Sequence, residues 1–265
     1  MNNTEKENQA SNFILKETSF SGKTAIILGS GLGEYAELLS EQKILAFSKI
    51  PYYPISNVEG HAGELVSGKI FGKEILIAKG RVHCYEGYSL RKVTFPIRVF
   101  KKCGIRNLII TNSSGSLQKK NKPGTLMLIK GHLDCSFQNN YHELKLVTGD
   151  KYHSKELIKL SEKVALNHKI KVVSGNYCWV LGPSYETPAE VQELIRLGGD
   201  AVGMSTVPEV IESGRLKMDA LVLSCMTNMA AGIIDKSLDH NEVVSVANKS
   251  SKDMTKLIYK LIKRI

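Results

Sequence analysis

Two basic side chains, Arg81 and His83, follow an apolar stretch of the sequence and stand two residues apart. On an extended backbone, residues two apart face the same way, and Tyr85 continues that face. A guanidinium offers planar donors suited to phosphate oxygens, and an imidazole adds a donor that can titrate near neutral pH. The spacing therefore favours an anion site, although an Arg-x-His pair also arises by chance.

A second candidate for anion binding is the glycine-rich segment 29–33, which joins an apolar run to a helical pattern. Glycines let the backbone turn tightly, and a helix start carries a partial positive charge, so Ser30 and this turn could hold a phosphate. The segment is not the dinucleotide-binding fingerprint, because Glu34 stands where a third glycine is needed, and it lacks the lysine of a P-loop. A purely structural turn explains the same residues equally well.

Two helix starts are marked by the capping-box sequences 187–190 and 206–209, in each of which a Thr precedes a Glu by three residues. Glu186 precedes the first box and Ser205 precedes the second. A carboxylate and a hydroxyl would thus be held by rigid elements, where they could bind a ligand. The simpler interpretation is two well-capped helices.

Three other polar residues stand beside apolar or glycine-rich segments. Asn228 ends a buried-looking strand, where it could hydrogen-bond a planar base or instead bond its own backbone and cap a turn. His61 lies within a Gly-His-Ala-Gly segment, and His240 begins the last helical pattern. For these two, a loop or surface histidine is the default interpretation.

The elements that must position these residues alternate between short apolar runs and amphipathic patterns. The runs predict strands over 24–28, 64–70, 74–79, 107–111, 126–129, 171–181 and 220–227. The patterns predict helices over 33–39, 90–103, 155–167, 188–197, 207–215 and 241–265. Such alternation predicts an α/β fold, with a central mixed β-sheet flanked by helices. No boundary signal divides the chain, so residues 1–265 are expected to form one domain, with residues 1–20 as a polar lead-in that is helical over 12–16.

Composition narrows the classes of protein and partner. The chain has 265 residues and a formal net charge of +10, which suits an anionic partner such as phosphate, nucleic acid or a membrane surface. No run approaches the roughly 20 apolar residues of a membrane helix, and the polar N-terminus predicts no secretion signal. Five scattered cysteines without a CxxC pair argue against a disulfide scaffold or zinc site and predict a reducing cytoplasm.

The basic helix 241–265 is best interpreted as packed by its apolar stripe, although a membrane or nucleic-acid contact would also fit.

Taken in order, the motifs resemble those of the trimeric purine nucleoside phosphorylases, and the bacterial members more than the mammalian ones. The resemblance runs from about residue 22 to the C-terminus, and its most specific parts are Arg-x-His-x-Tyr-Glu-Gly (81–87) and GMSTVPE (203–209). The other matching segments are GSGLG (29–33), GHAG (60–63), TNSSGS (111–116), GPSYETPAE (182–190) and TNMAAG (227–232).

The resemblance implies a role for each matching position. Phosphate would be bound by Ser30, His61, Arg81, His83, the backbone at Ser113, and Ser205. Ribose would meet Tyr85 and Met204, with His240 near the 5′-hydroxyl, and the purine would meet Tyr185, Glu186, Val202 and Asn228. Asn228, His83 and Glu86 would be the catalytic residues, Glu86 by holding its neighbours in place.

The implied activity is reversible phosphorolysis of purine (2′-deoxy)ribonucleosides to the free base and (deoxy)ribose 1-phosphate. Negative charge then develops on the departing purine, where Asn228 would donate a hydrogen bond, and positive charge develops on the sugar. The Glu186 carboxylate would accept from N1–H, so the 6-oxopurine nucleosides inosine and guanosine are the expected substrates. The resemblance also implies inorganic phosphate as co-substrate, no metal or other cofactor, no nucleic-acid or membrane partner, and a cytoplasmic homotrimer.

Two other functions remain open at this point. A methylthioadenosine phosphorylase would share the fold, but that enzyme favours an acidic group where Asn228 stands. A non-catalytic nucleoside- or nucleic-acid-binding protein is suggested by the net charge alone. The sequence also departs from the family at three places. Ser113–Ser116 replaces a usual Ala-Ala-Gly-Gly, Tyr185 stands where Phe is usual, and 134–155 is shorter than in many members.

Overall fold

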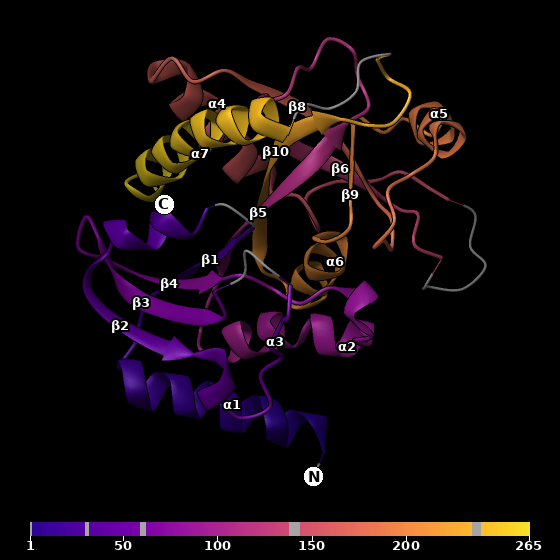
Figure 1. The fold of residues 1–265 in the computed structure, drawn as a ribbon. Coiled ribbons are helices and arrows are strands. Elements are labelled where there is room, and N and C mark those ends of the chain that lie inside the picture. The colour runs from indigo at the N-terminus through magenta and orange to yellow at the C-terminus, as the bar shows by residue number, and fades with distance from the viewer. Residues whose placement is uncertain (1, 30–31, 59–61, 138–143, 235–239) are drawn as a thin grey trace.

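A computed structural model of the protein describes residues 2–29, 32–58, 62–137, 144–234 and 240–265, of which 240–249 are described as helical backbone (Figure 1). These residues form a ten-stranded mixed sheet with helices on both faces. The strands are β1 (Thr24–Leu28), β2 (Ser40–Ala46), β3 (Glu64–Ile70), β4 (Lys73–Lys79), β5 (Asn107–Ser116), β6 (Leu126–Asp134), β7 (Val147–Thr148), β8 (Val172–Trp179), β9 (Ala201–Gly203) and β10 (Asp219–Met229).

The helices lie between these strands and at both ends of the chain. The α-helices are α1 (Asn3–Thr18), α2 (Leu90–Val93), α3 (Phe95–Lys102), α4 (Lys155–Asn167), α5 (Pro188–Arg196), α6 (Val207–Arg215) and α7 (His240–Ile262). Three short 3₁₀ helices are η1 (Gly33–Leu38), η2 (Phe47–Lys49) and η3 (Cys84–Glu86). No described helix is both long enough and apolar enough to cross a membrane.

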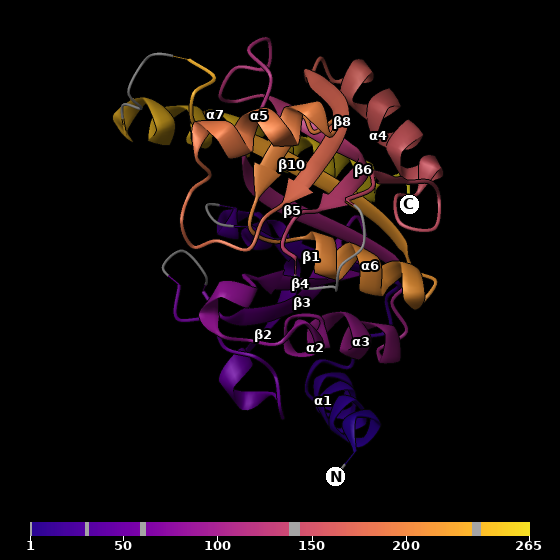
Figure 2. The same ribbon diagram turned by 90° about the vertical axis from the view of Figure 1, so that its right-hand side faces the viewer.

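The sheet is partly open and partly closed on itself (Figure 2). On the open side the order is β5-β1-β4-β3-β2, and β1 runs parallel to both β4 and β5. On the other side β10 pairs parallel with β5 and antiparallel with β6, while β8 and β9 lead from β6 back to β5. Five strands therefore close into a ring, an arrangement that the expectation of a central mixed sheet did not include.

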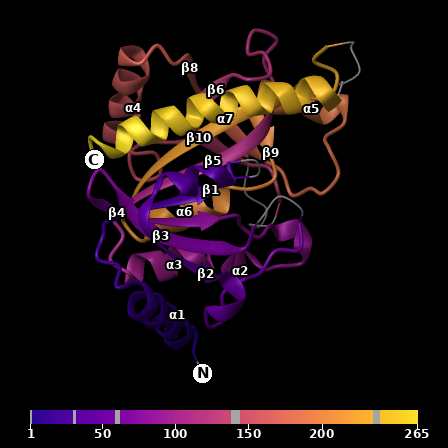
Figure 3. The same cartoon turned by 60° about the vertical axis from the view of Figure 1, so that its left-hand side comes forward.

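Strand β1 shows why helices cover both faces of the sheet. Ala25 and Ile27 pack into one core, with residues of α1, α3 and α6, whereas Ile26 and Leu28 pack into a second core, with residues of α4 and α7. Successive strand residues point to opposite faces, so a strand buried on both sides has an uninterrupted apolar sequence. Figure 3 shows α4 and α7 together on the side away from α1 and α3.

Most predicted elements are confirmed, and α4 and α6 have the predicted bounds. The apolar stripe of α7 is buried, with Met254, Leu257 and Leu261 at 0% exposure, so this stripe is a packing face as expected. Two predicted helices differ. Residues 33–38 form a 3₁₀ helix, and the helix predicted over 90–103 is divided at Thr94, directly before the Phe-Pro that begins α3. Pro96 has no N–H to donate to the Lys92 carbonyl, so it cannot continue the preceding helix, whereas proline is favoured in a helix's first turn and a new helix begins there.

The N-terminal lead-in is more ordered than the sequence predicted. It forms the 16-residue helix α1, capped by Asn2, instead of a short helix over 12–16. Only a narrow stripe of α1 that includes Ala10 and Ile14 is apolar and buried. The hydrophobic periodicity of this part of the sequence is therefore weak, and the full helix was not predicted. Its buried Glu7 also accepts a 2.7 Å hydrogen bond from Arg98 of α3.

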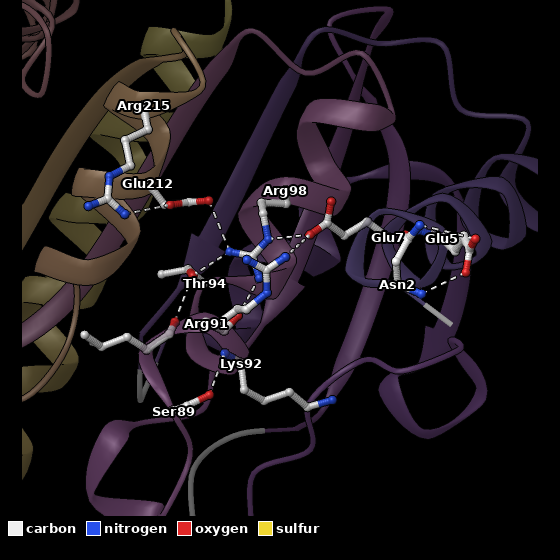
Figure 4. A network of polar contacts seen from close by, with 11 residues as sticks. Asn2, Glu5, Glu7, Ser89, Arg91, Lys92, Thr94, Arg98, Glu212 and Arg215 are labelled. Atoms are coloured by element: carbon white, nitrogen blue, oxygen red, sulfur yellow. Dashed lines mark hydrogen bonds and ion pairs between the residues drawn. The ribbon is translucent and has the colours of Figure 1, made fainter.

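Arg98 links three helices (Figure 4). Its Nε donates to Glu7 of α1, and its Nη1 donates to Glu212 of α6 at 3.1 Å. Buried charges are tolerated when they are paired in this way. The interaction attaches α1 to the domain and holds α6 against α3.

Candidate active site

A cavity opens where the carboxyl ends of β1, β4, β5 and β10 meet. These strands are parallel neighbours, so the residues that follow them gather at one edge of the sheet. Strand β9 and the loop after β8 complete the walls. The lining residues are Gly29, Arg81, His83, Asn112, Ser113, Ser114, Gly115, Tyr185, Glu186, Val202, Gly203, Met204, Ser205, Thr227 and Asn228. Most of the positions predicted from the motifs therefore share one cavity.

Four residues of the predicted phosphate site are described and line the cavity, namely Arg81, His83, Ser113 and Ser205. Arg81 is buried, and its Nη1 donates to the Ser205 hydroxyl at 3.4 Å although 124 residues separate the two. Gly29, which begins the glycine-rich turn, also lines this cavity. Its backbone packs closely against β5, where a Cβ would lie only 3.0 Å from backbone atoms, so a larger residue would not fit. Ser30 and His61 lie outside the described residues, so their roles stay predictions.

The turn that presents Ser205 is held in an unusual conformation. Thr206 has φ 80°, a strained value for a β-branched residue, and the buried Asn112 donates from Nδ2 to its hydroxyl at 2.9 Å. The capping box predicted here is wrong, because the Thr206 side chain makes no cap hydrogen bond to α6. Its presumed partner, Glu209, instead accepts from Arg81 Nε at 3.1 Å.

His83 is oriented by Glu86. The Oε1 atom of Glu86 accepts from the His83 backbone N–H at 2.7 Å and lies 3.1 Å from His83 Nδ1, while Oε2 accepts from the Ser56 hydroxyl at 2.9 Å. Burial, reinforced by Arg81, lowers the pKa of His83 despite the opposing effect of Glu86. The imidazole is therefore neutral near pH 7, with the Glu86 carboxylate beside its Nδ1, and the role of Glu86 in the reaction stays a prediction.

The residues predicted to meet ribose lie together beside the loop after β8. Tyr85 is stacked on His83, with ring centroids 4.7 Å apart, although Tyr85 itself is not among the lining residues. Met204 and Tyr85 approach Gly182 so closely that a Cβ there would lie 2.4 Å from the Met204 sulfur and 3.1 Å from the Tyr85 ring. His240 is the first residue of α7, and its side chain lies outside the described residues.

Glu186 and Tyr185 form the outer wall where the purine was predicted. The capping box of α5 that follows them is confirmed, with Thr187 accepting from the Glu190 N–H. Burial raises the pKa of Glu186, which is half-buried, whereas Tyr185 is 81% exposed. The exposed ring is available to cover a bound ligand.

Asn228 forms the opposite wall together with Val202, which pairs with Gly115 across β5 and β9. Its Nδ2 donates to the Met229 carbonyl at 3.1 Å, and its Oδ1 accepts from the Thr227 hydroxyl at 3.1 Å. Asn228 therefore bonds the local backbone, which was one of its two interpretations, and it also lines the cavity, so its hydrogen bond to a base stays a prediction. The two bonds fix the orientation of its amide.

Two buried residues of the site were not identified from the sequence. Asn112 lines the cavity and supports Thr206, but in the TNSSGS segment only the backbone at Ser113 was assigned a role. Glu209 pairs with Arg81, but its spacing from Thr206 is that of a capping box. An isolated Asn after a buried strand was the one available signal for Asn112, and no local pattern distinguishes Glu209.

The comparisons with known proteins agree with this geometry. A family model described as the phosphorylase superfamily matches residues 23–263. The chain belongs to this superfamily.

Its similar relatives are purine nucleoside phosphorylases. The chain is 41% identical over 272 residues to purine nucleoside phosphorylase 1 of Geobacillus stearothermophilus, covering 100% of this chain and 99% of the relative. Isoform 2 of the Schistosoma mansoni enzyme, in complex with cytosine and ribose-1-phosphate, superposes with a TM-score of 0.88 at 33% identity, covering 99% and 97% of the two chains. A schistosome purine nucleoside phosphorylase in complex with hypoxanthine gives 0.87 at 29% identity, covering 99% and 98%. The predicted resemblance and fold are confirmed.

Proposed function

We propose that the protein catalyses reversible phosphorolysis of purine nucleosides, giving the free base and a pentose 1-phosphate. One observation carries the proposal: Arg81 with Ser205, suited to an oxyanion, and Asn228 with Glu186, suited to a purine, line the same cavity. The two groups come from distant parts of the chain, and packing alone does not require them to meet there. Relatives that share this fold are named for this activity.

Phosphate is the nucleophile and co-substrate in this proposal. Arg81 supplies N–H donors to its oxygens, Ser205 supplies a hydroxyl, and the Ser113 backbone supplies an N–H. Because Nδ1 of the neutral His83 ring donates to Glu86, its Nε2 accepts the P–OH proton of hydrogen phosphate. As the N-glycosidic bond lengthens, positive charge develops on the sugar, which a phosphate held beside the anomeric carbon stabilises before it attacks. Holding both substrates in one cavity also removes much of the entropic barrier to their reaction.

The purine must leave with its developing negative charge stabilised. Asn228 donates one amide hydrogen of Nδ2 toward N7 and keeps the other on the Met229 carbonyl. The Glu186 carboxylate accepts from N1–H of a 6-oxopurine. Adenine has no N1–H, and an unsatisfied buried acceptor costs about 1–3 kcal/mol, so we expect inosine and guanosine to be preferred by about one to two decades.

Incubation with inosine tests the proposal. We expect hypoxanthine to be released with inorganic phosphate and not without it, and ribose 1-phosphate to accumulate in equal amount. Adenosine and methylthioadenosine, assayed in parallel, test the base preference, and a faster reaction with methylthioadenosine would favour the alternative phosphorylase. If neither inosine nor guanosine reacts in the presence of phosphate, the proposed function is wrong.

We further propose that the protein acts as a cytoplasmic homotrimer. The trimer is the arrangement implied by the family resemblance. The five cysteines are free in the structure, which supports a reducing compartment.

A further inference from the structure

Behind the proposed phosphate site lies a buried ion pair. Arg81 Nε donates to Glu209 Oε1 at 3.1 Å, and the two side chains are only 5% and 4% exposed. Arg81 is on the segment after β4, and Glu209 is in the first turn of α6, 128 residues later. The pair therefore connects the two segments that carry Arg81 and Ser205.

Glu209 contacts Arg81 from the side away from the main cavity. Arg81 lines the main cavity, and it also lines a second, small cavity of about 10 Å³ that contains Tyr53 and Glu209 in its wall. Glu209 does not line the main cavity. A space of about 10 Å³ holds no more than one water molecule, so of these two cavities, both lined by described residues, only the main cavity can bring phosphate to Arg81.

The hydrogen bonds of the guanidinium indicate what the pair does. Nε is bound to Glu209 and Nη1 to Ser205, while Nη2 is buried with no hydrogen-bond partner among the described residues. An arginine side chain has many rotamers, and anchoring one edge of its planar group fixes the direction of the remaining donors. Supporting contacts of this kind preorganise a binding site.

We propose that Glu209 is a positioning residue, which fixes the guanidinium of Arg81 for phosphate through the hydrogen bond between Oε1 and Nε. The inference rests on the proposed function and adds a residue that does not contact the substrates. Burial raises the pKa of Glu209, and Arg81 opposes that shift, so the carboxylate depends on Arg81 for its charge.

Two conservative variants separate the effect of the position of the Glu209 side-chain oxygens from the effect of their charge. Glu209→Asp keeps the charge but withdraws the oxygens by one methylene, and Glu209→Gln keeps an oxygen at Nε but removes the charge. If position matters, Glu209→Asp raises the KM for phosphate about tenfold, the effect expected for loss of one hydrogen bond to a charged group. Glu209→Gln keeps this KM within about threefold of the wild-type value, and the KM for inosine stays within about twofold in both.

Glu212→Asp is the matched control, because Glu212 lies one turn further along α6 and pairs with another buried arginine, Arg98, away from the cavity. We expect it to lower the melting temperature without changing the KM for phosphate. The proposal is overturned if Glu209→Asp leaves the KM for phosphate unchanged, or raises the two KM values together, or if Glu209→Gln is the more damaging variant.

Calorimetric titration of each variant with inorganic phosphate alone provides a readout that needs no turnover. We expect phosphate affinity to fall about tenfold in Glu209→Asp and to change little in Glu212→Asp. A wild-type protein that binds phosphate in a Glu209-dependent way but does not cleave nucleosides would disprove the proposed function and keep this inference. Equal phosphate affinity in all variants of an active enzyme would disprove the role of Glu209 and leave the proposed function intact.

Discussion

At the scale of single residues, Asn228 combines a fixed orientation with a place in the cavity wall. Thr227 and the Met229 carbonyl hold its amide, so the group need not be ordered when a base arrives. Donors that are preorganised toward developing charge contribute more to catalysis than donors that must reorganise.

We expect Asn228→Ala to lower kcat for inosine phosphorolysis at least about tenfold, and as much as 10²–10³-fold if its donor acts mainly in the transition state. Steady-state kinetics with both substrates varied would measure this. Asn176→Ala is a suitable control, because Asn176 also donates to a backbone carbonyl, that of Gly198, but does not line the cavity. Turnover at the wild-type level in Asn228→Ala would remove this residue from the mechanism.

The sequence identified the residues of the site that stand in distinctive motifs, and it failed where one pattern has two uses. Arg81, His83 and Ser205 were found because their segments occur in a recognisable order. Glu209 was assigned to a helix cap because Thr-x-x-Glu is a capping signal, yet a cap needs an extended Thr, and Thr206 has positive φ. The Thr206 hydroxyl accepts instead from Asn112, which is remote in sequence, so local reasoning could not find this arrangement.

At the scale of elements, β6 is joined to the segment before α4 by two buried histidines. His132 Nδ1 lies 2.8 Å from His153 Nε2, and both rings are 2% exposed, with Tyr152 packed edge-on against His132. Burial lowers the pKa of His132 to about 4, against the attraction of Asp134, and burial together with His132 lowers that of His153 to about 3. The folded protein therefore holds this pair neutral.

This pair should make the fold sensitive to acid. An unfolded histidine titrates near pH 6.5, so the unfolded chain takes up these protons first, and stability is lost as pH falls from about 6.5 toward 4. Each imidazole contributes up to about 1.4 kcal/mol per pH unit to this slope. Urea unfolding at pH 7, 6 and 5 would measure it, and His132→Asn, which keeps a hydrogen-bonding side chain without titrating, should flatten it. Parallel pH profiles for the wild type and this variant would contradict the assignment.

The secondary-structure elements differ in how well the sequence alone predicts them. Strands buried on both faces, such as β1, were predicted from their uninterrupted apolar runs, and the long helix α7 was predicted from its helical periodicity. Strand β2 is largely exposed, and β7 and β9 have two and three residues, so no apolar run marks them. Such strands are formed by pairing with neighbours, which a local pattern does not contain.

At the scale of the whole molecule, the proposed homotrimer makes a direct prediction. Light scattering on the purified protein should give a mass near three times the 29.3 kDa of one chain. Phe137, which is 79% exposed and lies three residues after β6, is a large apolar side chain that an interface could cover. Phe137→Ser should then weaken the assembly on dilution, whereas Leu166→Ser, at an equally exposed position in α4, should not. A monomeric mass at all concentrations would contradict the trimer.

The position of β10 has a consequence for how the protein is made. This strand spans residues 219–229, yet it pairs with both β5 and β6, which precede it in the chain by about a hundred residues. Until β10 has been synthesised, β5 and β6 each have an unpaired edge where β10 will bind. Unpaired strand edges can pair with other chains, so this state is prone to aggregation. Truncated products that end before β10 also lack Asn228. Nascent chains therefore gain a closed ring and a complete cavity in the same late event, and incomplete chains gain neither.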